Sequence, residues 1–162
     1  MINKIKPNVS QLHFKNFGST VYLIKLKNQI VLIDTSTEEN KQELINDLKK
    51  LNLQPEEISI LIITHDHWDH VGNNNLFKKA KIITNKNTKD LPKEFKTIQT
   101  PGHTQDSFCI LYDDVLFSGD TIFHHNGRGR SDLPGGSEKQ ILKSVQDLKK
   151  INYKILCPGH ID

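Results

Sequence analysis

Four side chains that can bind a metal ion stand within six consecutive residues. The stretch from 65 to 70 reads His-Asp-His-Trp-Asp-His, and its candidate ligands are His65, His67, Asp69 and His70. His65 and His67 are two residues apart, so in an extended backbone they project to the same side. Asp69 and His70 come later and can face a second point. This spacing suits two metal ions better than one.

A strand is expected to deliver these ligands. Residues 58–64 are a run of β-branched and aliphatic residues, which predicts a buried strand ending at the first histidine. The carboxyl ends of strands are where α/β folds place their functional sites. Three more candidate ligands, His103, Asp120 and His160, also follow predicted strands. We therefore expect one rim of the sheets to gather all seven.

The rest of the pattern predicts strands and helices around a two-sheet core. Residues 12–14, 20–27 and 29–34 predict an antiparallel meander, and residues 39–51 have the apolar period of a helix. Residues 71–80 predict a short helix-like piece and residues 85–96 mostly loop. Ser137, three residues before Gln140, predicts the start of a second helix. Further strands are predicted at residues 81–84, 95–99, 107–112, 115–118 and 153–157.

The length and composition favour one domain over residues 1–162. Charged residues make up 25% and hydrophobic residues 35% of the chain, and no run of about 18 apolar residues is present that would cross a bilayer. No apolar segment follows the lysines at the N-terminus, so no secretory signal is expected. We expect a cytoplasmic protein without membrane association.

The charge distribution argues against a nucleic-acid partner. The net charge of +3 comes from 22 Lys and Arg against 19 Asp and Glu, and the lysines are spread along the chain rather than clustered. Cys109 and Cys157 lie far apart without CxxC spacing, which predicts buried thiols rather than a disulfide framework.

Four motifs occur in the order in which they occur in a known family. They are THDHWDH at residues 64–70, PGHT at 101–104, SGDTIF at 118–123 and PGH at 158–160. The chain resembles the metallo-β-lactamase-fold hydrolases. Within them it is most similar to the compact glyoxalase-II-like group, because GRSDLPGG at residues 129–136 is similar to that group's GRTDLPGG.

The resemblance implies an α+β fold, a four-layer αββα sandwich of two mostly antiparallel sheets flanked by helices. It also implies a single domain without the C-terminal helical domain that supplies glutathione contacts in full-length glyoxalase II. Ser36 stands where the family motif LIDTG has glycine, and Asp106 stands where the group often has glycine. These departures, and the missing helical domain, put glutathione itself in question as part of the substrate.

Two metal sites follow from the resemblance. One would use His65, His67 and His103, and the other would use Asp69, His70 and His160, with Asp120 bridging them. Imidazoles and carboxylates favour Zn²⁺ and also suit Fe or Mn, so we expect two divalent ions, with zinc the first choice. Asp69 and Asp120 are also the predicted catalytic residues.

The expected activity is hydrolysis of a small thioester, or of a related ester or lactone, by a hydroxide that bridges the metals. A thiolate leaving group, with a pKa of about 8.5, needs little protonation, which suits a site without an evident general acid. The alternative is a mononuclear-iron persulfide dioxygenase, which the resemblance also allows through positions matching His65 or its first-site equivalent, His103 and Asp120. A metal-dependent nuclease is less favoured.

The substrate is expected to be a small anionic molecule. Arg128 and Arg130 are the only arginines, and both follow Asp120 in a loop. Arg130 is the predicted anchor for a substrate carboxylate, with loop bracing by Asp132 an equally weighted alternative.

Arg128 and His125 are further predicted substrate contacts. Asp34 is predicted either to orient a metal-bound histidine or to cap a turn. The sequence leaves the oligomeric state open.

Overall fold

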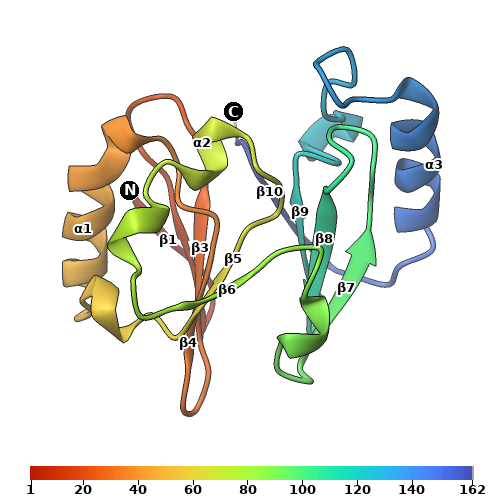
Figure 1. The fold of residues 1–162 in the computed structure, drawn as a ribbon. Coiled ribbons are helices and arrows are strands. Elements are labelled where there is room, and N and C mark those ends of the chain that lie inside the picture. The colour runs from red at the N-terminus through yellow and green to blue at the C-terminus, as the bar shows by residue number, and fades with distance from the viewer. Residues whose placement is uncertain (162) are drawn as a thin grey trace. The chain divides into compact units, whose positions relative to one another are not determined.

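The computed structural model describes residues 1–161, and the chain divides into two compact units. Unit 1 is Met1–Ile83, and unit 2 begins at Thr84. Each unit contains one β-sheet and one longer helix, labelled in Figure 1.

The sheet of unit 1 has six strands in the order in which they occur in the chain. The first four run antiparallel, which confirms the predicted meander, and the last two join in parallel. The strands are β1 (Ile2–Lys6), β2 (Val9–Leu12), β3 (Val21–Lys25), β4 (Ile30–Ile33), β5 (Ile60–Ile62) and β6 (Lys81–Ile83).

Two predictions at the start of this sheet were wrong. The first edge strand, β1, was not predicted, because its lysines and asparagine hide the apolar alternation of a partly exposed strand. The strand predicted at residues 12–14 lies earlier, as β2, and ends at Leu12.

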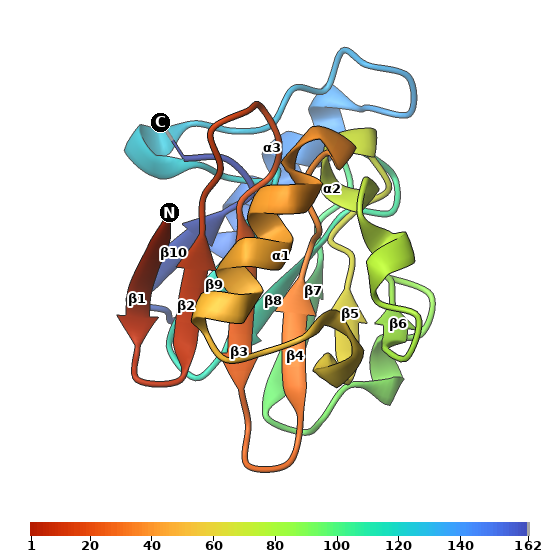
Figure 2. The same ribbon diagram turned by 90° about the vertical axis from the view of Figure 1, so that its left-hand side faces the viewer.

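One amphipathic helix covers a face of the unit 1 sheet. It is α1 (Lys41–Lys50), preceded by the 3-10 turn η1 (Glu38–Asn40), and Figure 2 shows it lying across the strands. Leu44 and Leu48 are fully buried in one apolar cluster with side chains from the sheet, such as Leu23 and Leu61. The predicted apolar stripe therefore packs as expected.

The segment after β5 differs from its prediction. A short helix, α2 (Trp68–Val71), begins within the histidine-rich stretch itself, and the 3-10 turn η3 (Asn74–Leu76) and plain turns follow it up to residue 80. The helix-like piece predicted at residues 71–80 was therefore wrong. No apolar period marks α2, because four residues are too few to show one and backbone hydrogen bonds to other segments hold the turn.

The sheet of unit 2 has the order β10-β9-β8-β7. β7 (Phe95–Gln99), β8 (Phe108–Tyr112) and β9 (Val115–Gly119) form an antiparallel meander, and β10 (Ile155–Pro158) joins β9 in parallel. The parallel pairing requires a crossover, which α3 (Glu138–Leu148) supplies. Leu148 of this helix packs in a cluster with Cys109 and Leu116 of the sheet.

The start of α3 forms half of the predicted capping box. The hydroxyl of Ser137 accepts a hydrogen bond from the backbone N–H of Gln140. The Gln140 side chain instead accepts a hydrogen bond from Gln105 at 2.8 Å, so it does not return to the cap. Three more 3-10 turns complete the elements: η2 (Pro55–Glu57), η4 (Thr88–Asp90) and η5 (His124–Asn126).

The α+β fold class with two mixed sheets is confirmed. The single domain over residues 1–162 and the missing helical domain stay predictions. Both cysteines are buried thiols of unit 2, as predicted. In the part of the chain that the structure describes, no helix is long and apolar enough to span a bilayer.

Candidate metal centre

Unit 1 brings its four candidate ligands together at the end of β5. The Nε2 atom of His65 lies 3.1 Å from Nδ1 of His67, so the two imidazoles can converge on one point. His67 is still extended, and α2 starts directly after it. The helical turn carries Asp69 and His70, with Asp69 Oδ2 4.0 Å from His70 Nε2. The ring of His70 also lies close to that of His65, with centroids 4.0 Å apart, so the four side chains form one cluster and the division into two pairs stays a prediction.

Asp34 and Thr64 decide which nitrogen of two histidines carries the proton. The Asp34 carboxylate accepts hydrogen bonds from Nδ1 of His70 at 2.8 Å and from the Thr64 backbone and hydroxyl at 2.9 and 2.8 Å. Since the Thr64 hydroxyl donates to Asp34, it accepts from Nδ1 of His65 at 3.1 Å. Both imidazoles then carry their proton on Nδ1 and keep the Nε2 lone pair for a ligand.

Backbone hydrogen bonds hold α2 in place. The carbonyl of His70 accepts from the backbone N–H of Thr35 at 2.8 Å and from its hydroxyl at 3.0 Å. The Gly72 N–H donates to the carbonyl of Ser36 at 2.9 Å. A Cβ at Gly72 would lie 2.5 Å from the backbone nitrogen of Glu38, so only glycine allows this approach. The segment after β4 therefore fixes the turn that carries the ligands.

Ser36, the departure from the family motif, occupies a left-handed backbone position. Its φ is +59°, a conformation that glycine adopts without strain. The Asn40 side chain donates a hydrogen bond to the Ser36 hydroxyl at 3.0 Å. The serine thus keeps the backbone shape that the motif's glycine would give, and its hydroxyl is satisfied.

Unit 2 gathers its three candidate ligands around one carboxylate. Asp120 Oδ2 lies 3.5 Å from Nε2 of His103 and 3.4 Å from Nε2 of His160. These residues follow β7, β9 and β10, and His103 and Asp120 are buried. The predicted convergence at strand ends is therefore present in this sheet too.

A backbone carbonyl orients His103. Its Nδ1–H donates to the carbonyl oxygen of Arg130 at 2.7 Å, which leaves Nε2 facing Asp120. Gly129 makes this path possible, because a Cβ there would lie 1.8 Å from the carbonyl oxygen of Asp120. Sequence reasoning missed the carbonyl, since every residue has one; the glycine before Arg130 was the available signal.

A buried hydroxyl pair joins the two ligand-bearing turns of unit 2. Thr100, at the end of β7, lies 2.8 Å from Thr121 through their side-chain oxygens. One residue stands three positions before His103 and the other directly follows Asp120. Neither threonine was predicted to have a role, although Thr121 is within the SGDTIF motif.

The arginine side chains have partners on the surface of the loop. Arg130 donates to both carboxylate oxygens of Asp132, at 3.0 and 2.8 Å, and this pairing lowers the pKa of Asp132 to about 2. Both side chains are about two-thirds exposed. Arg128 donates to Glu138 at 2.6 Å. The contact between Arg130 and Asp132 is the one expected if the arginine braces the loop. The predicted roles of Arg130 and Arg128 in substrate binding stay predictions.

The donor chemistry fits divalent metal ions. Unit 1 offers three imidazoles and a carboxylate, and unit 2 offers two imidazoles on either side of a carboxylate. Borderline-soft ions such as Zn²⁺ and Fe²⁺ prefer this mixture of nitrogen and oxygen. Orienting hydrogen bonds to the far nitrogens of His65, His70 and His103 are typical of ligating histidines.

The sequence matches one known family along nearly all of its length. Residues 15–87 and 88–160 match the model of the family described as the metallo-beta-lactamase superfamily.

Relatives and solved structures agree with that match. The chain is 33% identical over 143 residues to the probable metallo-hydrolase MJ0296 of Methanocaldococcus jannaschii, covering 80% of this chain and 70% of the relative. It is 32% identical over 193 residues to the probable metallo-hydrolase MJ0888 of the same organism, covering 94% and 92%. The crystal structure of TTHA1623 in a di-iron-bound form has the same fold, with a TM-score of 0.76, 21% identity, and coverage of 94% and 92%.

Proposed function

Because the chain belongs to the metallo-β-lactamase superfamily, we propose that it is a metal-dependent hydrolase of small anionic thioesters. A related ester or lactone is the neighbouring substrate class. The observation that carries the proposal is the fixed orientation of the donors: Asp34 with Thr64 in one unit, and the Arg130 carbonyl in the other, hold imidazoles with Nε2 available to a ligand.

The proposed ligand set uses both units. His65, His67 and His103 would hold one ion, and Asp69, His70 and His160 would hold the other, with Asp120 between them. When bound, two divalent ions would lower the pKa of a water molecule and polarise the carbonyl group of the substrate. We propose Zn²⁺ as the resident metal, with Fe and Mn as alternatives.

The protein's own groups would orient the reactants. The Asp69 and Asp120 carboxylates can accept hydrogen bonds from the attacking water, so each is proposed to aim it at the carbonyl carbon. His70 cannot accept a proton at Nδ1, because that atom donates to Asp34. The proton released by the water would therefore be held at a carboxylate oxygen, and the thiolate would leave without needing it.

A substrate carboxylate is the proposed reason for selectivity towards anions. The Arg130 guanidinium is exposed, and its Nε and Nη2 atoms donate to the two carboxylate oxygens of Asp132. A planar guanidinium has five donors, so Arg130 can contact a second carboxylate while it keeps its partner. This supports an anchoring role that operates together with loop bracing.

One experiment tests the function directly. The purified protein would be assayed for metal content and offered S-lactoyl thioesters of glutathione and of N-acetylcysteamine, with a persulfide and dissolved O₂ as the competing assay. We expect two zinc ions per chain and thioester hydrolysis. His67→Ala and Asp120→Ala are each expected to reduce turnover by about 100-fold or more, while Asp66→Asn, an exposed neighbour, leaves it near wild type.

Two results would contradict the proposal. One iron ion per chain with O₂ consumption on the persulfide would replace hydrolysis by a dioxygenase reaction. Unchanged turnover in either ligand variant would remove the two-metal mechanism.

A further inference from the structure

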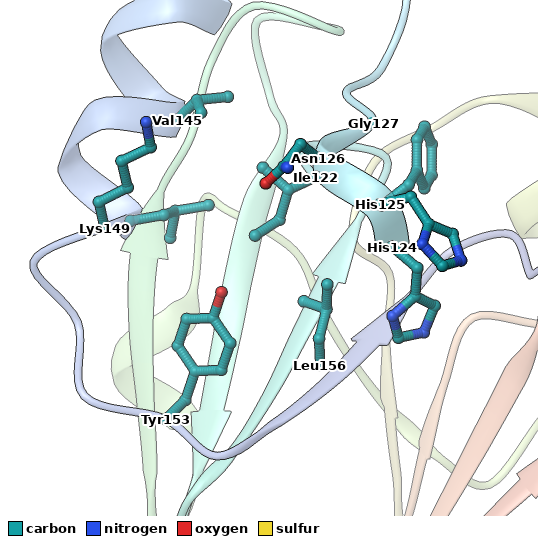
Figure 3. Close-up of a pocket in the computed structure, with 11 residues that line it drawn as sticks. Ile122, His124, His125, Asn126, Gly127, Val145, Lys149, Tyr153 and Leu156 are labelled. Atoms are coloured by element: carbon teal, nitrogen blue, oxygen red, sulfur yellow. The ribbon is translucent and has the colours of Figure 1, made fainter.

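Unit 2 contains a cavity that none of the seven candidate ligands lines. Its volume is about 530 Å³, and it lies between the last turns of α3, the start of β10 and the loop at residues 122–127 (Figure 3). Apolar side chains form its floor, among them Ile122, Leu148 and Leu156. Cavities of this size with an apolar floor are typical of small-molecule sites.

Polar groups surround this floor. Lys149 and Tyr153 lie on one side of the cavity, and His124 and His125 lie on the other (Figure 3). Within residues 1–161, none of these four side chains makes a hydrogen bond or ion pair with the rest of the protein; the two imidazoles only contact each other, with ring centroids 6.5 Å apart. No carboxylate is among the lining residues. All four groups can donate a hydrogen bond, and one carries a positive charge at neutral pH.

The backbone holds the two histidines at the rim. His125 and Asn126 both adopt left-handed conformations, with φ of +55° and +62°. Two backbone hydrogen bonds close the loop: the N–H of Phe123 donates to the carbonyl of Gly127 at 2.8 Å, and the N–H of Gly127 donates to the carbonyl of His124 at 3.0 Å. Left-handed positions in residues other than glycine are uncommon, and they cluster at functional sites.

Two backbone carbonyls in the last turn of α3 are paired. The carbonyls of Val145 and Leu148 accept backbone hydrogen bonds from Lys149 and Ile151, so they are already paired. The nearby Asp147 is bound to Lys150 at 2.6 Å. Lys149 is the basic residue with a permanent charge among the lining residues.

We propose that this cavity binds a small amphipathic carboxylate, with the apolar chain on the floor and the carboxylate on the side lined by Lys149 and Tyr153. Buried apolar surface would supply most of the affinity, and the donors would select an anionic head group over a neutral or cationic one. His125, predicted from the sequence to contact the substrate, would then serve a second site. This site is independent of the proposed hydrolysis.

Calorimetric titration of the full, metal-loaded protein with octanoate tests the proposal. We expect one saturable site per chain, weaker binding of 1-octanol and octylammonium, and an affinity lowered about three- to tenfold by Lys149→Gln. Lys143→Gln, which removes an exposed lysine of the same helix outside the cavity, is the matched control and should bind as wild type does. Val145→Phe, which fills the cavity from its wall, should abolish binding.

Three outcomes would overturn the site. They are no saturable binding of octanoate, equal affinity for octanoate and octylammonium, and octanoate binding that survives Val145→Phe in a variant whose circular dichroism shows a folded protein. Because octanoate could also reach the metal ligands, His160→Ala is titrated in parallel. Loss of binding in that variant, with Lys149→Gln unchanged, would assign octanoate to the metal centre and reject the cavity.

Discussion

At the scale of single residues, one carboxylate outside the proposed ligand set controls the histidines of unit 1. Asp34 contacts His70 directly and His65 through Thr64, so its position sets the orientation of both imidazoles. Burial makes the contact strong, since Asp34 is 2% exposed.

Replacing this carboxylate should weaken metal binding more than it weakens the fold. Asp34→Asn keeps the size but offers one acceptor oxygen in place of two, and the amide can rotate a donor towards His70. We expect zinc affinity to fall about 10–100-fold, measured by competition with a chromophoric chelator. Asp66→Asn changes an exposed carboxylate beside the ligands and should leave zinc affinity unchanged. If both variants lose zinc affinity equally, the loss comes from the change in net charge and not from the contact with His70.

The dual role of Arg130 is also testable at this scale. Arg130→Ala should raise KM about five- to tenfold for a thioester that carries a carboxylate and leave kcat nearly unchanged. Asp132→Ala keeps the guanidinium and should leave KM at or below the wild-type value. If both variants raise KM equally, for neutral as well as anionic substrates, the arginine only braces the loop.

At the scale of elements, α3 locks the turn that carries His103. The N–H of Ser137 donates to the carbonyl of Gly102 at 2.8 Å, and the hydroxyl of Ser144 donates to the carbonyl of Pro101 at 2.8 Å. Gly102 has φ of +139°, and a Cβ there would lie 2.2 Å from the backbone nitrogen of Ile141. Because Gly102 has no side chain, the helix packs directly against the backbone of the turn.

A pair of glycine substitutions separates this packing from simple backbone strain. Gly102→Ala must push α3 away from the turn and should lower the free energy of unfolding by about 2–3 kcal/mol and weaken metal binding. Gly135→Ala has φ of +85° but nothing within 4 Å, so it should cost only about 1 kcal/mol and leave the metal in place. Urea unfolding and metal content measure both; equal effects would mean that the close approach does not matter.

At the scale of the whole molecule, the strands and the ligand positions were more predictable than the connections. The apolar runs predicted β7 with its observed bounds, and β8 and β9 to within one residue. The strands β8 and β9 are mostly buried, so their apolar residues form continuous runs that stand out in the sequence. The start of α2 could not be predicted in this way, because a backbone hydrogen bond from Thr35 helps to determine it. The direction of β10 could not be predicted either, because the crossover through α3 determines it.

The same distinction holds for the candidate site. The seven candidate ligands stand out by residue type and spacing, and within each unit they lie near one another. The groups that orient them were harder to find: Asp34 was open between two roles, and the Arg130 carbonyl and the Thr100–Thr121 pair carry no residue-type signal for a metal site.

Stability of the whole molecule should fall in alkaline solution through one buried thiol. Burial raises the pKa of Cys109 from 9.0 to about 11, so the unfolded chain loses this proton at lower pH than the folded chain. The contribution is complete below pH 9 and is lost as the pH rises to about 11, by about 2–3 kcal/mol. Urea titrations at pH 8 and 11 should show a smaller pH dependence for Cys109→Ser; an equal dependence would assign the loss to other groups.

The strand order of unit 1 has a consequence for how the protein acquires its metal during synthesis. Every strand of this sheet pairs with its neighbour in the chain, so the sheet can form on the ribosome as soon as Ile83 has emerged. His160 comes after the crossover through α3 and is translated last of the seven. Nascent chains are therefore expected to bring the four candidate ligands of unit 1 together before the three candidate ligands of unit 2 are complete.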